Sequence, residues 1–267
     1  MEMEKVWQLE VAKKSLKKQS KLRAIDTFLE STSGKKCLEI GCDTGVTSYF
    51  LRKRGGDWIS VDGDKEKVEI ARKLVGDTVF LTDGRSLNFA DATFDCVAVI
   101  DFLEHIETDQ EFIREIYRVL KPSGSLYVTV PHTRGGKDLI LNRLRWWLGF
   151  KPSDYGHVRK GYSLEDLCTR LEKGGFKVTG YTTFSRFFSE LIELVANYSY
   201  MFILNKGQHK GSLKGGIAPS SPEDLKQHQK SFKLYSLVYP VLWVISRLDE
   251  FISFTPGYIL MVSAKKA

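Results

Sequence analysis

Strand-like and helix-like segments alternate along the chain between residues 36 and 130, and this alternation constrains the fold more than any other feature. Five short apolar runs have the length of strands, and they lie at 37–40, 58–61, 79–81, 96–100 and 125–130. The fourth run is almost wholly apolar, as expected when both faces of a parallel strand are covered. The pattern predicts an α/β fold with an open, mostly parallel sheet and helices on both faces.

Helix signals separate these runs and continue beyond them. Asp64 is placed to cap a helix that stops at Gly76. Thr108 and Glu111 have the spacing of a capping box, which predicts a helix up to Leu120. Outside the alternating region, we predict helices over 4–30, 139–150 and 186–204, a loop over 205–221, and strands near 176–182 and 258–262.

The composition narrows the class of protein without fixing its partner. With 42% hydrophobic residues the chain can bury a full core, and its formal charge of +7 favours anionic partners such as phosphates, nucleic acid or acidic lipid surfaces. The first residues lack the layout of a signal peptide, and no apolar run approaches the roughly 18 residues of a membrane span. Because the four cysteines form no close pairs, we predict reduced thiols, no metal site and a cytoplasmic location.

The segment from Leu38 to Gly45 carries the strongest functional signal. An apolar strand leads into Gly41 and Gly45, and a helix follows. The glycines permit a tight turn and a close backbone approach to a ligand, while the helix start offers N–H groups to an anion. Asp43 and Val46 occupy the second and third glycine positions of the dinucleotide fingerprint, which disfavours pyrophosphate binding. The turn therefore predicts a cofactor site of another kind.

Two further aspartates follow successive strands. Asp62 ends the second strand, where a carboxylate can accept both hydroxyls of a ribose, and Asp83 follows the third, within reach of an adenine edge. Aspartate also favours loops for structural reasons. However, three such positions at successive strand ends line one crevice, and we interpret them as one site.

These features resemble the class I S-adenosylmethionine-dependent methyltransferases, in particular the group related to ubiquinone and menaquinone biosynthesis enzymes. The matching stretches follow the family's order and spacing, and they are residues 38–45, 61–62, 83–84, 94–97, 103–106 and 120–125. The resemblance implies a Rossmann-like, seven-stranded sheet closed by two antiparallel strands, plus a mainly helical C-terminal insertion. The implied divisions are an N-terminal basic helix (1–34), a cofactor-binding core (35–182), a helical insertion or acceptor cap (183–256) and a closing strand (257–267).

The resemblance also implies S-adenosylmethionine as cofactor and a role for each matching residue. Glu39, Gly41 and Gly45 would surround the methionine part. Asp62 would hold the ribose, and Asp83 would meet the adenine together with Gly84. The cofactor site predicted in this way comprises Glu39, Gly41, Cys42, Asp43, Gly45, Asp62, Gly63, Asp83, Gly84 and Asp101. The family usually has a glycine where Asp43 stands.

Methyl transfer from a sulfonium is a direct displacement, so a base is needed only when the acceptor holds a proton. Enzymes that methylate nucleobase or amide nitrogen resemble one another in an Asn/Asp-Pro-Pro-aromatic motif, and residues 101–104 read Asp-Phe-Leu-Glu instead. This difference favours oxygen or carbon acceptors. His157 and His105 are the predicted catalytic residues. Each also has a structural interpretation, His105 as packing beside the cofactor, which we favour, and His157 as a surface loop residue.

Three features outside the core allow two interpretations each. The basic residues of the first helix either contact phosphates or form a solvated face, which we favour, and they are Lys13, Lys14, Lys17, Lys18, Lys21 and Arg23. The apolar face over 139–150 suits either a lid or interfacial helix, or packing on the core. The apolar stretch 232–254, interrupted by Pro240, suits either a membrane interface or burial in the insertion, which we favour.

Together these inferences predict O-methylation of a small-molecule, sugar or lipid-linked acceptor. The first alternative is an RNA methyltransferase, supported only by the positive charge, because no RNA-binding module is recognised. The second is a partner protein that binds S-adenosylmethionine without catalysis. Peripheral membrane contact stays open, and the sequence does not indicate an oligomeric state.

Overall fold

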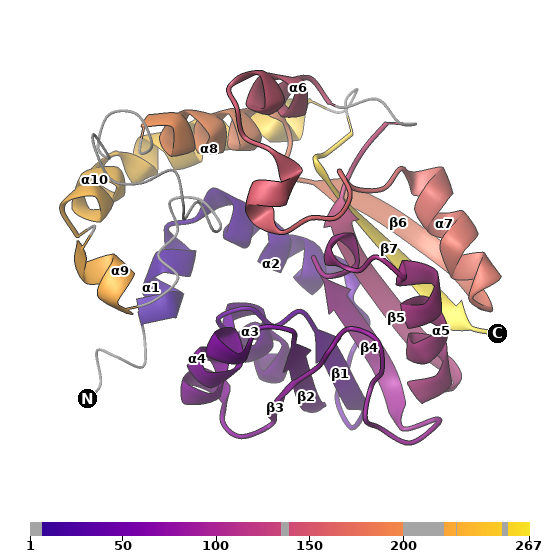
Figure 1. The fold of residues 1–267 in the computed structure, drawn as a ribbon. Helices are drawn as coiled ribbons and strands as arrows, with labels where there is room; N and C mark the ends of the chain where they lie inside the picture. The colour runs from indigo at the N-terminus through magenta and orange to yellow at the C-terminus, as the bar shows by residue number, and fades with distance from the viewer. Residues whose placement is uncertain (1–6, 135–138, 200–221, 228, 253–255) are drawn as a thin grey trace.

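The computed structural model describes residues 7–134, 139–199, 222–227, 229–252 and 256–267. One seven-stranded sheet runs through the molecule in the order β3-β2-β1-β4-β5-β7-β6, with helices on both faces (Figure 1). The strands are β1 (Lys36–Ile40), β2 (Asp57–Asp62), β3 (Val79–Leu81), β4 (Phe94–Ile100), β5 (Leu120–Pro131), β6 (Phe176–Phe184) and β7 (Ile259–Lys266). The first five strands are parallel, and β7 pairs antiparallel with both β5 and β6. The predicted α/β class and the two closing strands are therefore confirmed.

Each face of the sheet packs on its own group of helices. One face carries Leu38, Val97 and Val128, which lie in a core cluster with side chains of α5 (Asp109–Val119) and α7 (Leu164–Lys173). The other carries Trp58 and Tyr127, in a cluster with side chains of α2 (Leu16–Phe28) and α3 (Val46–Lys53). The helices of the sheet region are α3 (Val46–Lys53), α4 (Lys65–Val75), η1 (Leu103–His105), α5 (Asp109–Val119), α6 (Ile140–Trp147), η2 (Pro152–Tyr155) and α7 (Leu164–Lys173).

The N-terminal segment forms two helices, so the prediction of one helix over 4–30 is wrong. Helix α1 (Trp7–Lys13) is followed by α2 (Leu16–Phe28), which begins where the Ser15 hydroxyl accepts a hydrogen bond from the backbone N–H of Lys18. Ile25 of α2 and the following Leu29 are buried in the sheet core. Because it packs in this way, α2 is part of the core and not a separate basic helix.

The two helix starts predicted in the core have different outcomes. The Asp64 side chain accepts from two backbone N–H groups at the start of α4, as predicted. The Thr108 side chain makes no capping bond at the start of α5, so the predicted capping box is wrong. The buried Asp109 holds this end instead, through ion pairs with Arg159 and Arg170. Tertiary contacts thus replace the local cap.

The segment between β6 and β7 is helical where it is described. It contains α8 (Phe187–Ser199), α9 (Pro222–Gln227), α10 (Gln229–Ser246) and η4 (Arg247–Phe251). The end of the predicted helix over 186–204 and the predicted loop over 205–221 lie outside the described residues. Helix α10 continues through Pro240, contrary to our prediction, because Pro240 is exposed and water can reach the carbonyl group that proline leaves unpaired.

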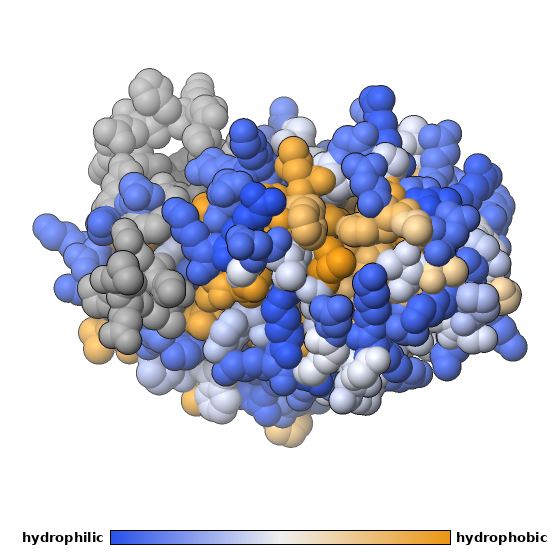
Figure 2. Space-filling view, turned by 90° about the horizontal axis from the view of Figure 1, so that it is seen from below, coloured by the Kyte–Doolittle hydropathy of each residue, from blue (hydrophilic) through white to orange (hydrophobic). Residues whose placement is uncertain are grey.

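Exposure corrects a second prediction for this segment. Most apolar side chains of α10 face solvent, so the predicted burial of 232–254 within the insertion is wrong. From below, opposite the layer of α6, α8 and α10, hydrophilic side chains cover most of the surface and hydrophobic ones gather in its middle (Figure 2). None of the described helices combines the length and the apolar composition that a bilayer crossing requires.

Candidate active site

The turn after β1 is tied to the end of β2. The backbone N–H of Gly41 donates to Val61 O at 2.9 Å, and the backbone N–H of Asp43 donates to Asp62 Oδ2 at 2.8 Å. The other carboxylate oxygen of Asp62 accepts from Asp64 N at 3.0 Å. Parallel pairing places the carboxyl ends of β1, β2 and β4 side by side. The structure therefore brings the predicted residues of the glycine turn and Asp62 together.

Backbone packing explains the glycines of this turn. Gly41 has φ +88°, and a Cβ there would lie 2.4 Å from Ile100 O. Gly45 has φ +86°, and a Cβ would lie 3.0 Å from the Cα of Ala71 on α4. Asp43 also has a positive φ of 50°, which accounts for the glycine usual at that position and for the aspartate that is tolerated here. The tight turn thus forms with an aspartate at position 43, where the family usually has a glycine.

Helix α2 lies across this end of the sheet and places two lysines, Lys18 and Lys21, on predicted site residues. Lys18 Nζ of α2 and Lys67 Nζ of α4 each lie 3.1 Å from the Asp43 carboxylate. Partial burial alone would raise the pKa of Asp43, but the two ammonium groups hold it below its ordinary value. Lys21, which is only 7% exposed, pairs with the Asp101 carboxylate at the end of β4. The solvated-face interpretation is therefore wrong for Lys18 and Lys21.

Glu39 is a buried acceptor beneath the turn. Its Oε2 accepts hydrogen bonds from the hydroxyls of Ser48 and Ser60, at 2.5 and 2.7 Å. Its Oε1 has no partner among the described residues. Burial raises the pKa of this carboxyl group. An unpaired buried acceptor fits a cofactor that carries an ammonium group, as the methionine part of S-adenosylmethionine does.

The remaining predicted cofactor residues lie nearby but differ in what they offer. The Cys42 side chain packs with Val68 and Ala71, and burial raises the pKa of its thiol, so this side chain belongs to the core. Gly63 follows Asp62 directly. Asp83 is exposed, and its Oδ1 accepts from Arg85 N and Ser86 N at 2.8 and 3.0 Å. At Gly84, a Cβ would lie 2.6 Å from the Ile106 side chain.

A loop returning after β5 brings His157 against His105, although 51 residues separate them. Val158 N donates to Glu104 O at 3.0 Å, which ties this loop to η1. The two imidazole rings lie 4.8 Å apart between centroids, edge to face. His105 Nδ1 lies 2.9 Å from Gly156 O. Since a carbonyl oxygen only accepts, Nδ1 carries the proton and Nε2 is the acceptor on a neutral His105 ring.

Glu104 completes this cluster, and sequence reasoning missed it as a site residue. It is 1% exposed, and its Oε2 has no partner among the described residues. Burial, together with the nearby Asp101, raises its pKa. The ligand atoms of Glu104, His105 and His157 lie within 4.8 Å of one another, a grouping that could hold a metal ion. The sequence contained the clue that Glu104 and His105 adjoin within one matching stretch.

Comparisons with known proteins agree with this geometry. Residues 38–128 match the family described as "Methyltransferase domain". The chain is 27% identical over 180 residues to a demethylmenaquinone methyltransferase of Tropheryma whipplei, an alignment that covers 61% of this chain and 75% of the relative. Residues 38–128 therefore form a methyltransferase domain, and the chain is an S-adenosylmethionine-dependent methyltransferase with the class I, Rossmann-like fold. S-adenosylmethionine is accordingly its cofactor and methyl donor.

Other relatives of this methyltransferase agree in class. It is 30% identical over 149 residues to a mitochondrial ubiquinone biosynthesis O-methyltransferase of Schizosaccharomyces pombe, with coverage of 53% of this chain and 54% of the relative. The enzyme thus spans about half the length of that relative. A solved structure from Thermotoga maritima, described as a methyltransferase and possible histamine N-methyltransferase, has the same fold, with a TM-score of 0.58, 18% identity and coverage of 97% and 93%.

Proposed function

We propose that the enzyme transfers the methyl group of S-adenosylmethionine to an oxygen atom of a small-molecule, sugar or lipid-linked acceptor. The contact of His157 with His105 carries this proposal, because it holds the ring on a loop that is tied to η1. Burial lowers the pKa of His157 to about 4, so its imidazole is neutral near pH 7. A neutral imidazole beside the residues that follow β4 suits the removal of a hydroxyl proton.

The residues predicted from the sequence keep their cofactor roles in this proposal. We propose that Asp62 accepts the ribose hydroxyls, that the Glu39 carboxyl faces the ammonium group, and that Asp83 with Gly84 borders the adenine. Asp101 directly follows β4, and its charge is balanced by Lys21. When bound, the cofactor supplies an electrophilic methyl group. The chain's own contribution is then to align the acceptor and to take its proton.

The segment 183–256, whose described part after β6 is helical, is proposed as the acceptor cap. Its helix α8 carries Glu193, whose charge raises the pKa of Lys17 on α2, and Glu190, which pairs with Arg145 of α6 at 2.5 Å. These charged contacts tie α8 to α2 and α6, beside the loop that carries His157. The names of the two relatives above favour a quinone-type acceptor.

Methyl-labelled S-adenosylmethionine tests the acceptor atom directly. The purified enzyme is given a prenylated ortho-dihydroxyphenol and, in parallel, the same compound with both hydroxyls already methylated. We expect label in the free phenol only, and loss of this transfer in His157→Ala. Label in the blocked phenol would indicate carbon methylation and overturn the proposal, and label only in added tRNA would favour the RNA alternative.

A further inference from the structure

Helix α10 presents a long apolar stripe to solvent. Its members recur every three or four residues and therefore lie on one side of the helix. They are Leu234, Leu237, Val238, Val241, Val244 and Ile245 of α10, continued by Leu248 of η4, and 37 to 78% of their surface is exposed. Single exposed apolar residues are ordinary, but a contiguous row marks an interaction surface.

The apolar surface extends beyond α10. Helices α6, α8 and α10 lie in one layer across the top of the molecule (Figure 1). Trp147 of α6 is 81% exposed, and Phe251 of η4 is 82% exposed. Val195 of α8 is also exposed. A broad face over several helices suits a planar partner better than a single partner helix would.

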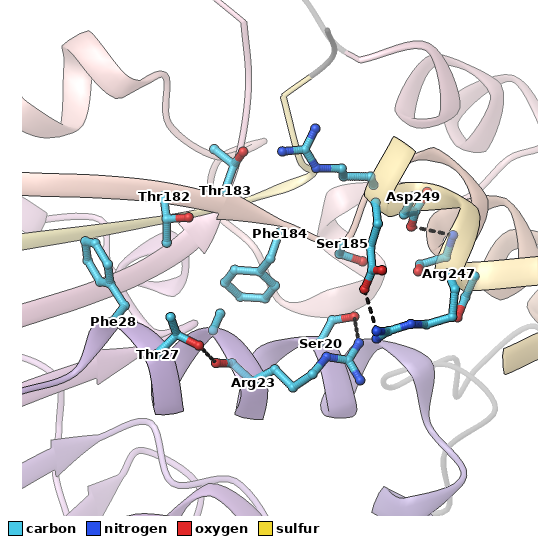
Figure 3. A pocket seen from close by; sticks show the side chains of 15 residues that line it. Ser20, Arg23, Thr27, Phe28, Thr182, Thr183, Phe184, Ser185, Arg247 and Asp249 are labelled. Atoms are coloured by element: carbon cyan, nitrogen blue, oxygen red, sulfur yellow. Dashed lines mark hydrogen bonds and ion pairs between the residues drawn. The ribbon is translucent and has the colours of Figure 1, made fainter. Parts of the chain in front are cut away.

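Basic side chains lie at both ends of the stripe. Lys230 and Lys233 are exposed in the first turns of α10. Beyond its other end, Arg23, Arg186 and Arg247 line a pocket of about 440 Å³ between α2, β6 and η4 (Figure 3). An apolar face flanked by cations is typical of a helix that binds an anionic membrane interface.

The carboxylates in this pocket already have partners. Asp249 accepts from Phe188 N and Ser189 N at 2.7 and 3.0 Å, and Glu250 pairs with Arg247 at 2.6 Å. The Arg23 guanidinium donates a hydrogen bond to the neutral hydroxyl of Ser20, at 3.2 Å. Among the described residues, no carboxylate forms an ion pair with Arg23, so its guanidinium lines the pocket with a charge that is available to an anion. This arrangement suits the phosphate of a lipid headgroup.

We propose that this layer docks the enzyme on an anionic lipid surface, with the α10 stripe at the acyl boundary and a headgroup phosphate in the pocket. Charge distinguishes this partner from a second copy of the chain. Two copies that each carry +7 repel one another, whereas an anionic surface attracts the chain. The inference goes beyond the proposed function and does not depend on the acceptor.

Vesicle sedimentation tests the docking. The full chain is mixed with vesicles of phosphatidylcholine alone, or with equal parts of phosphatidylcholine and phosphatidylglycerol. We expect binding to the anionic vesicles, lost in Leu237→Glu/Val241→Glu. Arg23→Ala should weaken binding by about fivefold, because a basic residue near such a surface contributes about this factor. Phe80→Glu is the matched control, since this exposed residue lies on β3 at the opposite edge of the sheet.

Four outcomes would overturn the proposal. The first is an absence of anionic-vesicle binding by the folded wild-type chain. The second is a concentration-dependent dimer that Leu237→Glu/Val241→Glu dissociates, which would assign the stripe to a second copy. The third is Arg23-dependent stabilisation by inorganic phosphate without vesicle binding, which would assign the pocket to a soluble anion. A large loss of thermal stability in the double variant would show that the stripe is covered within the chain and would likewise overturn the docking.

Discussion

Asp62 holds the turn after β1 with one carboxylate. Its two oxygens accept from the backbone N–H groups of Asp43 and Asp64, and it is 8% exposed. We propose that the ribose of the cofactor binds to this oriented acceptor. The side chain thus links the shape of the turn to the proposed affinity for the cofactor.

Replacing Asp62 with Ala should weaken S-adenosylmethionine binding by about tenfold to a hundredfold, because hydrogen bonds to an ionised acceptor are lost. Isothermal titration measures the change. Asp57→Ala is the control, since Asp57 is exposed at the other end of the same strand. Equal affinities for the two variants would remove Asp62 from the cofactor site.

His157 gives a prediction about pH as well as rate. His157→Ala should lower kcat by about a hundredfold to ten-thousandfold if the ring removes the acceptor proton. Because burial lowers its pKa to about 4, the ring stays neutral, and kcat/KM should fall only as the pH approaches about 4. A wild-type acid limb near the ordinary histidine value, unchanged in the variant, would contradict this role.

The lowered pKa of His157 also makes the stability of the fold depend on pH. A histidine whose pKa is lower in the folded chain than in the unfolded chain binds fewer protons when folded. His157 therefore costs no stability above its ordinary pKa and destabilises the fold progressively as the pH falls towards about 4. His157→Ala should show a shallower loss of thermal stability over that interval.

Among the elements, α2 joins the core of the sheet to the carboxyl ends of β1 and β4. Its inner side packs Ile25 in the core, and Lys18 and Lys21 reach residues that follow β1 and β4. Burial alone would raise the pKa of Asp101, but the ammonium of Lys21 holds it below its ordinary value. The lysines of α2 therefore stabilise the carboxylates of Asp43 and Asp101, which follow the neighbouring strands β1 and β4 at the carboxyl end of the sheet.

Lys21→Met should destabilise the enzyme by about 1 to 3 kcal/mol, because the Asp101 carboxylate loses its buried partner. Thermal unfolding measures the loss. Lys13→Met is the matched control, because Lys13 forms an exposed pair with Glu10 that contributes little. Similar midpoints for both variants would mean that the Lys21 pair adds no more than a surface pair.

At the scale of the whole molecule, cofactor binding should appear as a global gain in stability. Ligand at about 100 times its dissociation constant adds about 2.7 kcal/mol, which corresponds to a rise in Tm of roughly 5 to 10 °C for a chain of this size. Differential scanning fluorimetry with S-adenosylmethionine and with its demethylated product measures the shift. No shift with either ligand in a folded, cofactor-free sample would contradict the site.

Local patterns were enough to predict the alternation of strands and helices, the glycine turn and the acidic residues at strand ends. Each of these patterns spans only a few residues, and because the carboxyl ends of parallel strands share one edge of a sheet, Gly41 and Asp62 could be placed together. What distant segments contribute became clear only from how the chain packs. Lys18 and Lys21 read as a solvated face because their partners Asp43 and Asp101 lie far along the chain. The contact of His157 with His105 and the exposure of α10 depend likewise on how loops and helices pack, which periodicity does not encode.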